Sequence, residues 1–255
     1  YTHKSHIFEQ DKLQISKILE EAGIPIPKTM TVDEYLAESD ERVVLKPKGL
    51  SLGLGVLYVD RPTIEYFIGK RGPRIPLLNY PPTLDPEDFI LQEFIETPGD
   101  RFTSYRIFTV GDEILGGVLT TSRYTKTESE TGAKKNKRFY ERLPKAFGTY
   151  PIVSNVAVGG IQIGLSHRYY GRLLERNQQI LRDHGIDPDD RDIPEPLKEL
   201  AQSAGRELTK HGVVIAGQDW LQDREGNFHF LEANINAGWN IFRTLFFGGK
   251  KKLVV

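Results

Sequence analysis

The sequence of 255 residues contains no cysteine, almost no net charge and no long apolar run. Without cysteine, the chain can form no disulfide, no thiolate metal site and no cysteine nucleophile. The formal net charge of −1 gives no sign of a nucleic-acid or membrane surface. No apolar run approaches the roughly 18–20 residues of a membrane-spanning helix, and no signal-peptide pattern is visible. We therefore expect a cytoplasmic protein that binds neither nucleic acid nor membrane.

The composition is that of a soluble globular protein, with 38% hydrophobic and 27% charged residues. The length allows one large domain or two small ones. The chain begins at Tyr1 rather than at methionine, and it ends in the segment GGKKKLVV. We expect that a segment preceding Tyr1 is missing or was cleaved, and we interpret the end as a tail cut from a longer chain.

Apolar periodicity and turn residues predict a mixture of helices and antiparallel strands. Residues 11–22 carry a helical apolar stripe that Gly23 ends. Gly111 and Asp112 join two apolar strands in a way that is typical of a β-hairpin. A further helix is predicted over residues 196–212, with an apolar face made of Leu197, Leu200, Ala201, Ala204 and Leu208. These patterns indicate the α+β fold class.

The segment GQDWLQDREGNFHFLEANINAGW, residues 217–239, reads as two strands around a turn, with one carboxylate in each apolar run. When the turn is centred between Glu225 and Gly226, Asp219 lies opposite Glu232. Like charges directly opposite each other in a sheet repel, and acids beside apolar surface need a compensating partner. The hairpin therefore raises the question of what compensates these two acids.

The same register places Leu221 opposite Phe230, so packed apolar surface is expected beside the acids. Asn234 follows Glu232 by two residues and points to the same face of a continuing strand. Two carboxylates and an amide oxygen are hard donors that suit Mg²⁺ or Mn²⁺ and leave positions for phosphate oxygens. The six histidines show no ligand spacing. Two other interpretations of the hairpin stay open, a solvated face without an ion and a proton shared between the acids.

The segment VVLKPKGLSLGLGV ends an apolar strand with Lys46 and continues with Gly49, Ser51, Gly53 and Gly55. A glycine-rich turn allows backbone N–H groups to approach phosphate oxygens closely, and Lys46 adds a point charge. Because a strand rather than a helix follows, we expect a flap over a nucleotide and not a P-loop. The alternative is a glycine-rich hairpin without a ligand.

Together, these features follow the chain order of an ATP-grasp domain. The chain resembles the ATP-grasp superfamily, and most of all its RimK-like branch of ATP-dependent carboxylate–amine ligases. The resemblance covers most of the chain except roughly residues 124–150 and 165–193, which look like insertions. The matching segments are QDKLQISKILEEAGIPIPKT, VVLKPKGLSLGLGV, LQEFIE, YRIFTVGDEILGG, SNVAVGG and IAGQDWLQDREGNFHFLEANINAGW.

The resemblance implies an ATP-grasp fold in which two α+β subdomains with antiparallel sheets clasp ATP. It divides the chain into a first subdomain, residues 1–95, with the flap, and a second, residues 96–255, with the metal site. It also implies that the domain preceding the ATP-grasp domain is absent or truncated. Asp219, Glu232 and Asn234 match the metal ligands, usually of two Mg²⁺ ions, with Mn²⁺ as an alternative.

The resemblance also implies residues that bind ATP or take part in catalysis. Residues 92–95 match the hinge between the subdomains, where backbone groups and a carboxylate read adenine. The ATP-binding set is Lys12, Lys46, Gly49, Ser51, Gly53, Gly55, Gln92, Glu93, Phe94, Ile95 and Asp100. Catalytic roles fall to Lys46, Arg106 and Asn155.

The sequence departs from the family's pattern at three places. Ala237 precedes Gly238 where family members commonly have proline, and Ser104 stands where an acid often contacts the ribose. The arginine often found just before Ser-Asn in the SNVAVGG segment is absent, which puts the acceptor chemistry in doubt. Arg123 and Lys126 are candidates to replace it.

Enzymes of this kind join a carboxylic acid to an amine. The acid attacks the γ-phosphate of ATP, which gives an acyl phosphate and ADP, and the amine then displaces phosphate. The implied partners are small-molecule or peptide carboxylates and amines, and the oligomeric state stays open, a dimer included. Two alternatives remain, an ATP-grasp kinase that phosphorylates a small molecule and a non-catalytic ATP-binding or scaffold protein.

Overall fold

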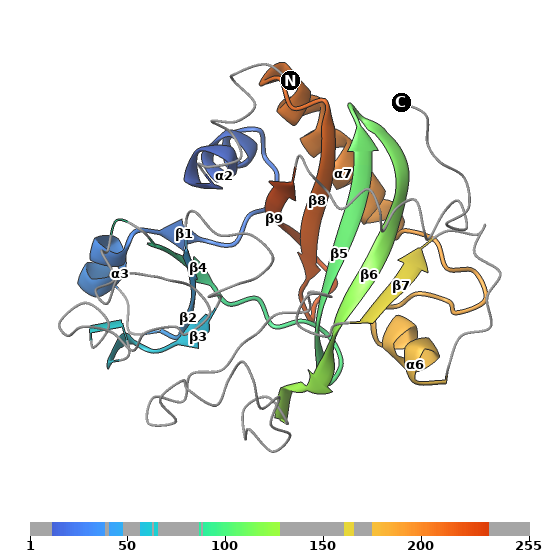
Figure 1. Cartoon of the computed structure of the whole chain (residues 1–255), viewed down its shortest axis with the longest axis horizontal. Coiled ribbons are helices and arrows are strands. Elements are labelled where there is room, and N and C mark those ends of the chain that lie inside the picture. Colours follow the sequence, from blue (N-terminus) through green and yellow to red (C-terminus); the bar gives the residue numbers. More distant parts are fainter. Residues whose placement is uncertain are drawn as a thin grey trace, which may run out of the picture.

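The computed structural model describes residues 12–38, 41–47, 57–62, 64–65, 87, 89–127, 161–165 and 175–234. The elements are α2 (Lys12–Glu21), β1 (Thr29–Met30), α3 (Val32–Glu38), β2 (Val43–Pro47), β3 (Leu57–Val59), β4 (Phe89–Glu93), β5 (Arg101–Val110), β6 (Glu113–Thr125), β7 (Ile161–Leu165), α6 (Glu175–Asp183), α7 (Glu195–Lys210), β8 (Ile215–Gln222) and β9 (Phe228–Asn234). They form two sheets that lie side by side (Figure 1), a four-stranded sheet β1-β4-β2-β3 and a five-stranded sheet β7-β6-β5-β8-β9. The strand pairs are antiparallel. The predicted α+β class with antiparallel sheets is therefore confirmed.

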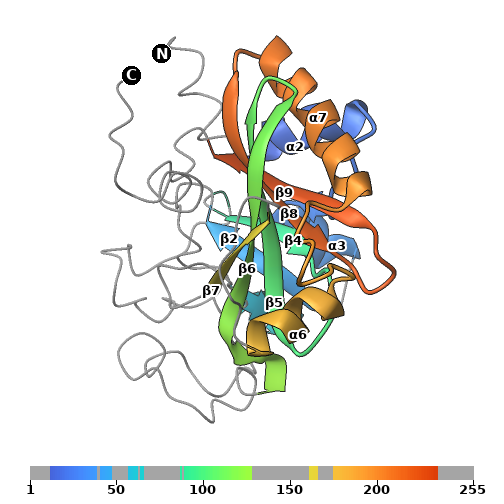
Figure 2. The same ribbon diagram turned by 90° about the vertical axis from the view of Figure 1, so that its right-hand side faces the viewer.

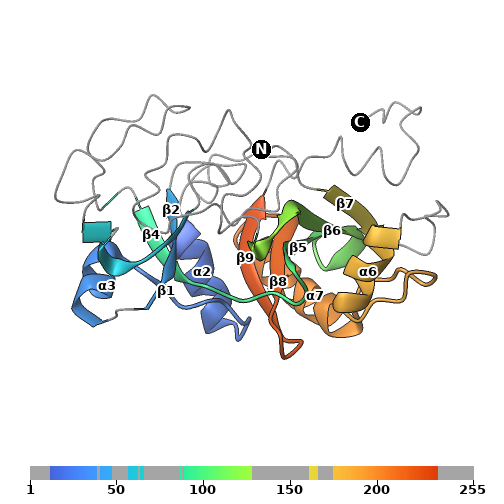
Figure 3. The same cartoon turned by 90° about the horizontal axis from the view of Figure 1, so that it is seen from below.

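Helices α2, α3, α6 and α7 lie on one side of the two sheets, as Figures 2 and 3 show. Each sheet packs its apolar face against these helices, and the side chains of the other face point away from them. None of the helices in the described ranges is long and apolar enough to cross a membrane.

The first sheet packs against α3, which begins with a capping box. The backbone N–H of Thr31 donates to the Glu34 carboxylate at 2.6 Å, and the backbone N–H of Glu34 donates to the Thr31 hydroxyl at 3.2 Å. The buried cluster consists of Met30, Val32, Tyr35, Val43, Leu45, Val59, Ile64, Phe89 and Leu91. Lys46 and Gln92 alternate with these core residues along β2 and β4, so they point to the other face, which we call the Lys46 face.

In the second sheet, strands β5 and β6 form the predicted hairpin. Val110 pairs with Glu113, so the connection consists of Gly111 and Asp112. Gly111 has a φ of 61°, a left-handed conformation that two-residue hairpin turns favour and that glycine adopts without strain. The sequence signal for this hairpin is therefore confirmed.

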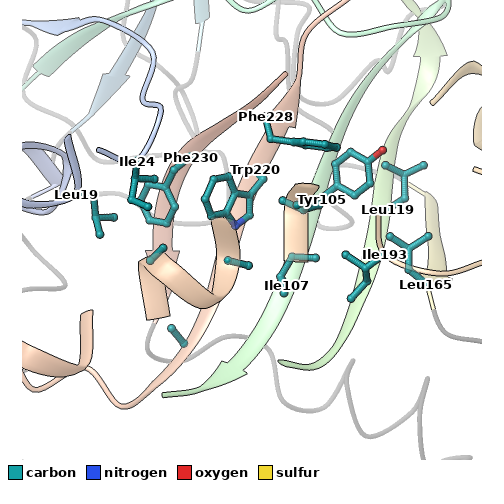
Figure 4. Close-up of a cluster of buried hydrophobic side chains, with 14 of the residues drawn as sticks. Leu19, Ile24, Tyr105, Ile107, Leu119, Leu165, Ile193, Trp220, Phe228 and Phe230 are labelled. Atoms are coloured by element: carbon teal, nitrogen blue, oxygen red, sulfur yellow. The ribbon is translucent and has the colours of Figure 1, made fainter. Parts of the chain in front are cut away.

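The larger core lies between the second sheet and helices α2, α6 and α7 (Figure 4). Trp220 and Phe230 are cross-strand partners whose ring centroids are 5.2 Å apart in an edge-to-face arrangement. Phe228 packs in the same way on Tyr105, at 5.5 Å. The predicted apolar face of α7 is confirmed, because four of its residues are buried and Leu200 packs against them: Leu197, Ala201, Ala204 and Leu208.

Helix α2 ends at Glu21 and is followed by a Schellman motif at Gly23, the residue that was predicted to end it. Gly23 has a φ of 78°, its N–H donates to the Glu20 carbonyl at 2.9 Å, and the N–H of Ile24 donates to the Leu19 carbonyl at 2.9 Å. The buried residues of this segment, Ile15, Leu19 and Ile24, belong to the core of the second sheet. Helix α2 packs against β9 and α7, so the beginning of the chain contributes to the larger core.

Residues 175–193, part of a segment that the resemblance leaves unmatched, also contribute to this core through Ile180, Leu181, Ile186 and Ile193. His184 is buried between Thr103, whose hydroxyl lies 2.7 Å from Nε2, and Gln222, whose Oε1 lies 2.9 Å from Nδ1. Because Gln222 Oε1 can only accept, Nδ1 donates to it. Burial lowers the pKa of His184, so this histidine is a neutral structural residue.

Arg106 lies between Tyr105 and Ile107, two core residues of β5. Asp219 lies between the core residue Trp220 and the buried Gln218, whose Nε2 donates to the Ala201 carbonyl of α7 at 2.9 Å. The side chains of Arg106 and Asp219 therefore point away from the helices. We call this side of the second sheet the Asp219 face. The Lys46 face and the Asp219 face look to the same side of the molecule, opposite the helices in Figure 3.

Helix α7 approaches the β5–β6 turn so closely that only glycine fits at position 205. A Cβ atom there would lie 2.1 Å from the carbonyl oxygen of Gly111. We expect Gly205→Ala to lower the free energy of unfolding by about 1–3 kcal/mol, the usual effect of overpacking, although alanine favours an open helix position by roughly 0.5–1 kcal/mol over glycine. Urea unfolding followed by circular dichroism measures this change. Gln202→Ala, on the exposed side of α7, is the control, and a Gly205→Ala variant as stable as that control would contradict the packing.

Candidate functional site

Three charged side chains of the Asp219 face lie in one row across the strands. Asp219 of β8 pairs with Glu232 of β9 on one side and with Arg106 of β5 on the other. The predicted opposition of the two acids is therefore confirmed. The arginine from the neighbouring strand completes the row, and it is the only member of the three with a positive charge.

The predicted pairing of Leu221 with Phe230 is wrong. Phe230 pairs with Trp220, and Leu221 pairs with His229. The turn is centred on Glu225, where the N–H of Asp223 donates to the carbonyl of Asn227, and this shifts the register by one residue. A bulge between Asp219 and Trp220 then restores it. The shift at the turn and the shift at the bulge cancel before Asp219 and Glu232, so the predicted pairing of these two acids is correct.

Arg106 binds Asp219 through both nitrogens of a guanidinium fork. Its Nε donates to Oδ1 at 2.6 Å, and its Nη2 donates to Oδ2 at 2.7 Å. Asp219 is only 9% exposed. Burial raises the pKa of Asp219, and the charge and hydrogen bonds of Arg106 oppose that shift. Asp219 in turn raises the pKa of Arg106, so the guanidinium stays charged.

Asn234 connects the two acids. Its Nδ2 donates to Asp219 Oδ2 at 2.9 Å and to Glu232 Oε1 at 3.2 Å. The three side chains therefore converge, as the alternation along β9 predicted. In the described ranges no three His, Cys, Asp or Glu side chains gather around one point, and the third donor here is an amide. Two carboxylates and an amide form a donor set that fits a hard divalent cation.

On the Lys46 face, a chain of hydrogen bonds runs from β2 to β1. Lys46 Nζ donates to Gln92 Oε1, and Gln92 Nε2 donates to the hydroxyl of Thr29 at 3.0 Å. Thr29 in turn donates to the Pro27 carbonyl at 2.9 Å. Gln92 is only 3% exposed, so its amide is fixed in place and holds the Lys46 ammonium.

Residues 94–100, between β4 and β5, connect the two sheets. Phe94 stacks on Tyr58 of β3 with ring centroids 4.3 Å apart, and its edge meets Phe102 of β5 at 6.2 Å. The Glu93 side chain turns toward β1, where its Oε2 accepts the backbone N–H of Lys28 at 3.2 Å. The aromatic contacts therefore join the first sheet to the second through this connection.

Asp100 and Lys126 lie near the end of that connection. Asp100 is exposed, and its Oδ1 lies 3.7 Å from Arg101 Nε. The Nζ of Lys126 donates to the backbone carbonyls of Thr97 and Gly99. The Lys126 ammonium is thus hydrogen-bonded to the backbone of residues 97–99.

Several residues assigned from the sequence are not described. Lys12 is the first residue of α2 and Arg123 lies in β6, but their side chains fall outside the description. The remaining ones lie outside the described residues altogether: Gly49, Ser51, Gly53, Gly55 and Asn155.

The sequence interpretation missed two parts of this arrangement. It did not pair Arg106 with Asp219, because these residues are 113 positions apart and no local signal reports that β5 and β8 are neighbours. It also missed Thr29, which lies in a strand of two residues. The position of Arg106 in the middle of an apolar strand was the available signal, since a charge there needs a partner.

Searches of the protein-family models and of the curated proteins found no match. Solved structures do resemble the chain. The D-cycloserine synthetase DcsG has a TM-score of 0.52 at 13% identity, over 90% of this chain and 63% of that one. The ATP-grasp ligase PsnB, complexed with a minimal precursor, has a TM-score of 0.51 at 14% identity, over 95% of this chain and 57% of that one. The chain has the ATP-grasp fold.

A third structure, the macrocyclase MdnC bound with the precursor peptide MdnA from Microcystis aeruginosa MRC, has a TM-score of 0.50 at 15% identity, over 95% of this chain and 57% of that one. At such identities the likeness is one of fold. The chain spans between 57% and 63% of the length of these three proteins. In this ATP-grasp fold, the described candidate residues lie on the Lys46 face, on the Asp219 face and in the segment between the sheets.

The ion pair at the centre of the Asp219 face can be measured by a double-mutant cycle in the absence of metal. We expect Arg106→Gln and Asp219→Asn to destabilise the protein individually, because each leaves the partner's charge uncompensated. The coupling energy between them should be about 0.5–3 kcal/mol by urea unfolding. The control cycle uses Arg101 and the exposed Asp100, which are 3.7 Å apart and should couple weakly. Equal coupling in the two cycles would contradict the fork as a stabilising contact.

Proposed function

We propose that this chain is the ATP-binding part of an ATP-dependent ligase of the RimK-like branch that joins a carboxylate to an amine. The observation that carries the proposal is the convergence of Asp219, Glu232 and Asn234 on one face of an ATP-grasp fold. Such a set of oxygen donors beside a buried carboxylate is expected where a divalent cation binds phosphate oxygens. The proposal rests on this site because a fold alone does not fix a function.

Asp219, Glu232 and Asn234 would hold Mg²⁺, with Mn²⁺ as an alternative. The amide of Asn234 points its nitrogen at both carboxylates, and half a turn about its terminal bond brings its oxygen to the same place. A bound Mg²⁺ supplies charge neutralisation at the β- and γ-phosphate oxygens. One PsnB structure of the same fold is complexed with Mg and ADP.

The Lys46 face would bind the nucleotide. Gln92 holds the Lys46 ammonium in place before ATP binds. Contact with a phosphate oxygen then costs little further side-chain entropy. Backbone groups of residues 92–95 and a carboxylate would contact adenine. The further ATP-binding residues in this proposal are Lys12, Gly49, Ser51, Gly53, Gly55 and Asp100, and Asn155 would line the phosphate region.

In the proposed reaction, an oxygen of the substrate carboxylate attacks the γ-phosphorus of ATP, and the bond to the β-phosphate oxygen breaks. This gives an acyl phosphate and ADP. The nitrogen of the amine then attacks the acyl carbon, phosphate leaves, and the amine loses a proton. The residues of the chain orient the reactants and balance charge, which is the usual contribution of a protein to phosphoryl transfer.

Small-molecule or peptide carboxylates and amines are the proposed substrates. Two proteins with the same fold are solved with precursors, PsnB with a minimal precursor and MdnC with the precursor peptide MdnA. We also propose the division into subdomains 1–95 and 96–255, which falls in the segment that links the two sheets. The oligomeric state, a dimer included, stays outside this proposal.

The test is ATP-dependent phosphate release by the complete protein with panels of acids and amines. We expect Glu232→Ala to reduce the rate by about 10²–10³-fold, the scale on which loss of one charge-stabilising group acts, while the circular dichroism spectrum stays unchanged. Glu225→Ala, at the exposed turn of the same hairpin, is the matched control and should keep the wild-type rate.

The products separate the ligase from the kinase. Release of ADP and phosphate only when acid and amine are both present supports the ligase, whereas a stable phosphorylated product from one substrate would support the kinase. Activity of Glu232→Ala equal to that of Glu225→Ala would refute the metal site.

A further inference from the structure

We propose that Arg106 couples the binding of the divalent cation to the binding of the triphosphate, by holding Asp219 until phosphate oxygens take its guanidinium. The inference rests on the proposed function and adds a mechanism to it. Arg106 would be a positioning residue that makes the site accept metal and nucleotide together and disfavours metal alone.

The first argument is geometric, because both oxygens of Asp219 are already occupied. Arg106 Nε lies 2.6 Å from Oδ1, while Oδ2 accepts from Arg106 Nη2 at 2.7 Å and from Asn234 Nδ2 at 2.9 Å. Asn234, which also bonds Glu232, lies at Oδ2, where Arg106 and Asn234 take both acceptor positions, so a cation that shares Oδ2 with these ligands displaces one of the two hydrogen bonds. Cation and guanidinium therefore compete for the same carboxylate.

The second argument is the charge balance of the row. Arg106, Asp219 and Glu232 carry one positive and two negative formal charges, so the row has a net charge of −1. A divalent cation alone changes this to +1 around the buried Asp219, with two positive groups beside each other. A triphosphate brings negative charge beside these two positive groups, and its oxygens accept a guanidinium fork as well as a carboxylate does.

The third argument is that the backbone of Arg106 is fixed, so this residue can respond to a ligand through its side chain. Its strand neighbours Tyr105 and Ile107 are fully buried in the larger core, and β5 is bonded to β6 and β8 on both sides. The backbone is thus fixed, whereas a long side chain can exchange partners. The Arg106 guanidinium would therefore have two states, one bound to Asp219 and one bound to phosphate oxygens. Coupling between two ligands requires such a pair of states.

The experiment measures Mn²⁺ binding by the electron paramagnetic resonance of free Mn²⁺, with and without a non-hydrolysable ATP analogue. Wild type should bind Mn²⁺ weakly alone and much more tightly with the analogue. In Arg106→Gln, we expect the Mn²⁺ dissociation constant without analogue to fall by about tenfold, within the usual range of coupling between sites. The enhancement by the analogue should shrink by the same factor.

Two variants complete the design. Arg206→Gln removes a charge from the exposed side of α7 and should leave Mn²⁺ binding as in wild type. Arg106→Lys keeps the charge but cannot form the fork, so it should bind Mn²⁺ alone more tightly than wild type and less tightly than Arg106→Gln. If Arg106→Gln does not fold, Arg106→Lys carries the test against wild type.

The outcomes separate this inference from the proposed function. If wild type binds the analogue with Mn²⁺ but a folded Arg106→Gln binds Mn²⁺ alone no more tightly than wild type, the coupling role is wrong and the ATP site stands. If wild type binds no analogue at any Mn²⁺ concentration, both are wrong. An increase in Mn²⁺ affinity that Arg206→Gln shares would also overturn the inference, since it would reflect net charge only.

Discussion

The ion pair between Arg106 and Asp219 is the interaction on which the Asp219 face depends. Asp219 is nearly buried and lies opposite a second acid, Glu232, so both burial and repulsion disfavour its charge. The fork from the neighbouring strand opposes these effects, and the Asn234 amide adds a hydrogen bond. The pair therefore stabilises the charge of a carboxylate at a place where burial and a second acid disfavour it.

The sheet makes this arrangement possible because its two faces have separate tasks. Alternate residues of β5, β8 and β9 pack against the helices and fix the backbone, and the residues between them form the charged row. The Trp220–Phe230 contact is the packed neighbour of the acids. The bulge beside it turns Asp219 and Glu232 to the same face. In the proposed function, the apolar core beneath the sheet thus fixes the positions of the residues that would hold the metal.

The sequence predicted features that depend on neighbouring residues. The end of α2 just before Gly23 and the turn at Gly111 follow from backbone conformations that glycine favours, and the acids oppose each other because they belong to one hairpin. The Leu221–Phe230 pairing failed because a bulge leaves little trace in a sequence.

Contacts between distant segments were not predictable in the same way. The packing of α2 on the second core and the Arg106–Asp219 pair depend on which strands and helices become neighbours. Local periodicity does not encode that choice.

The most direct test of the central claim, that the acids of the Asp219 face bind ATP through a divalent cation, is isothermal titration of the complete protein with ATP. The account predicts saturable binding with Mg²⁺ and a large loss of affinity when a chelator removes it. Equal affinity with and without Mg²⁺, or no binding in either case, would contradict it.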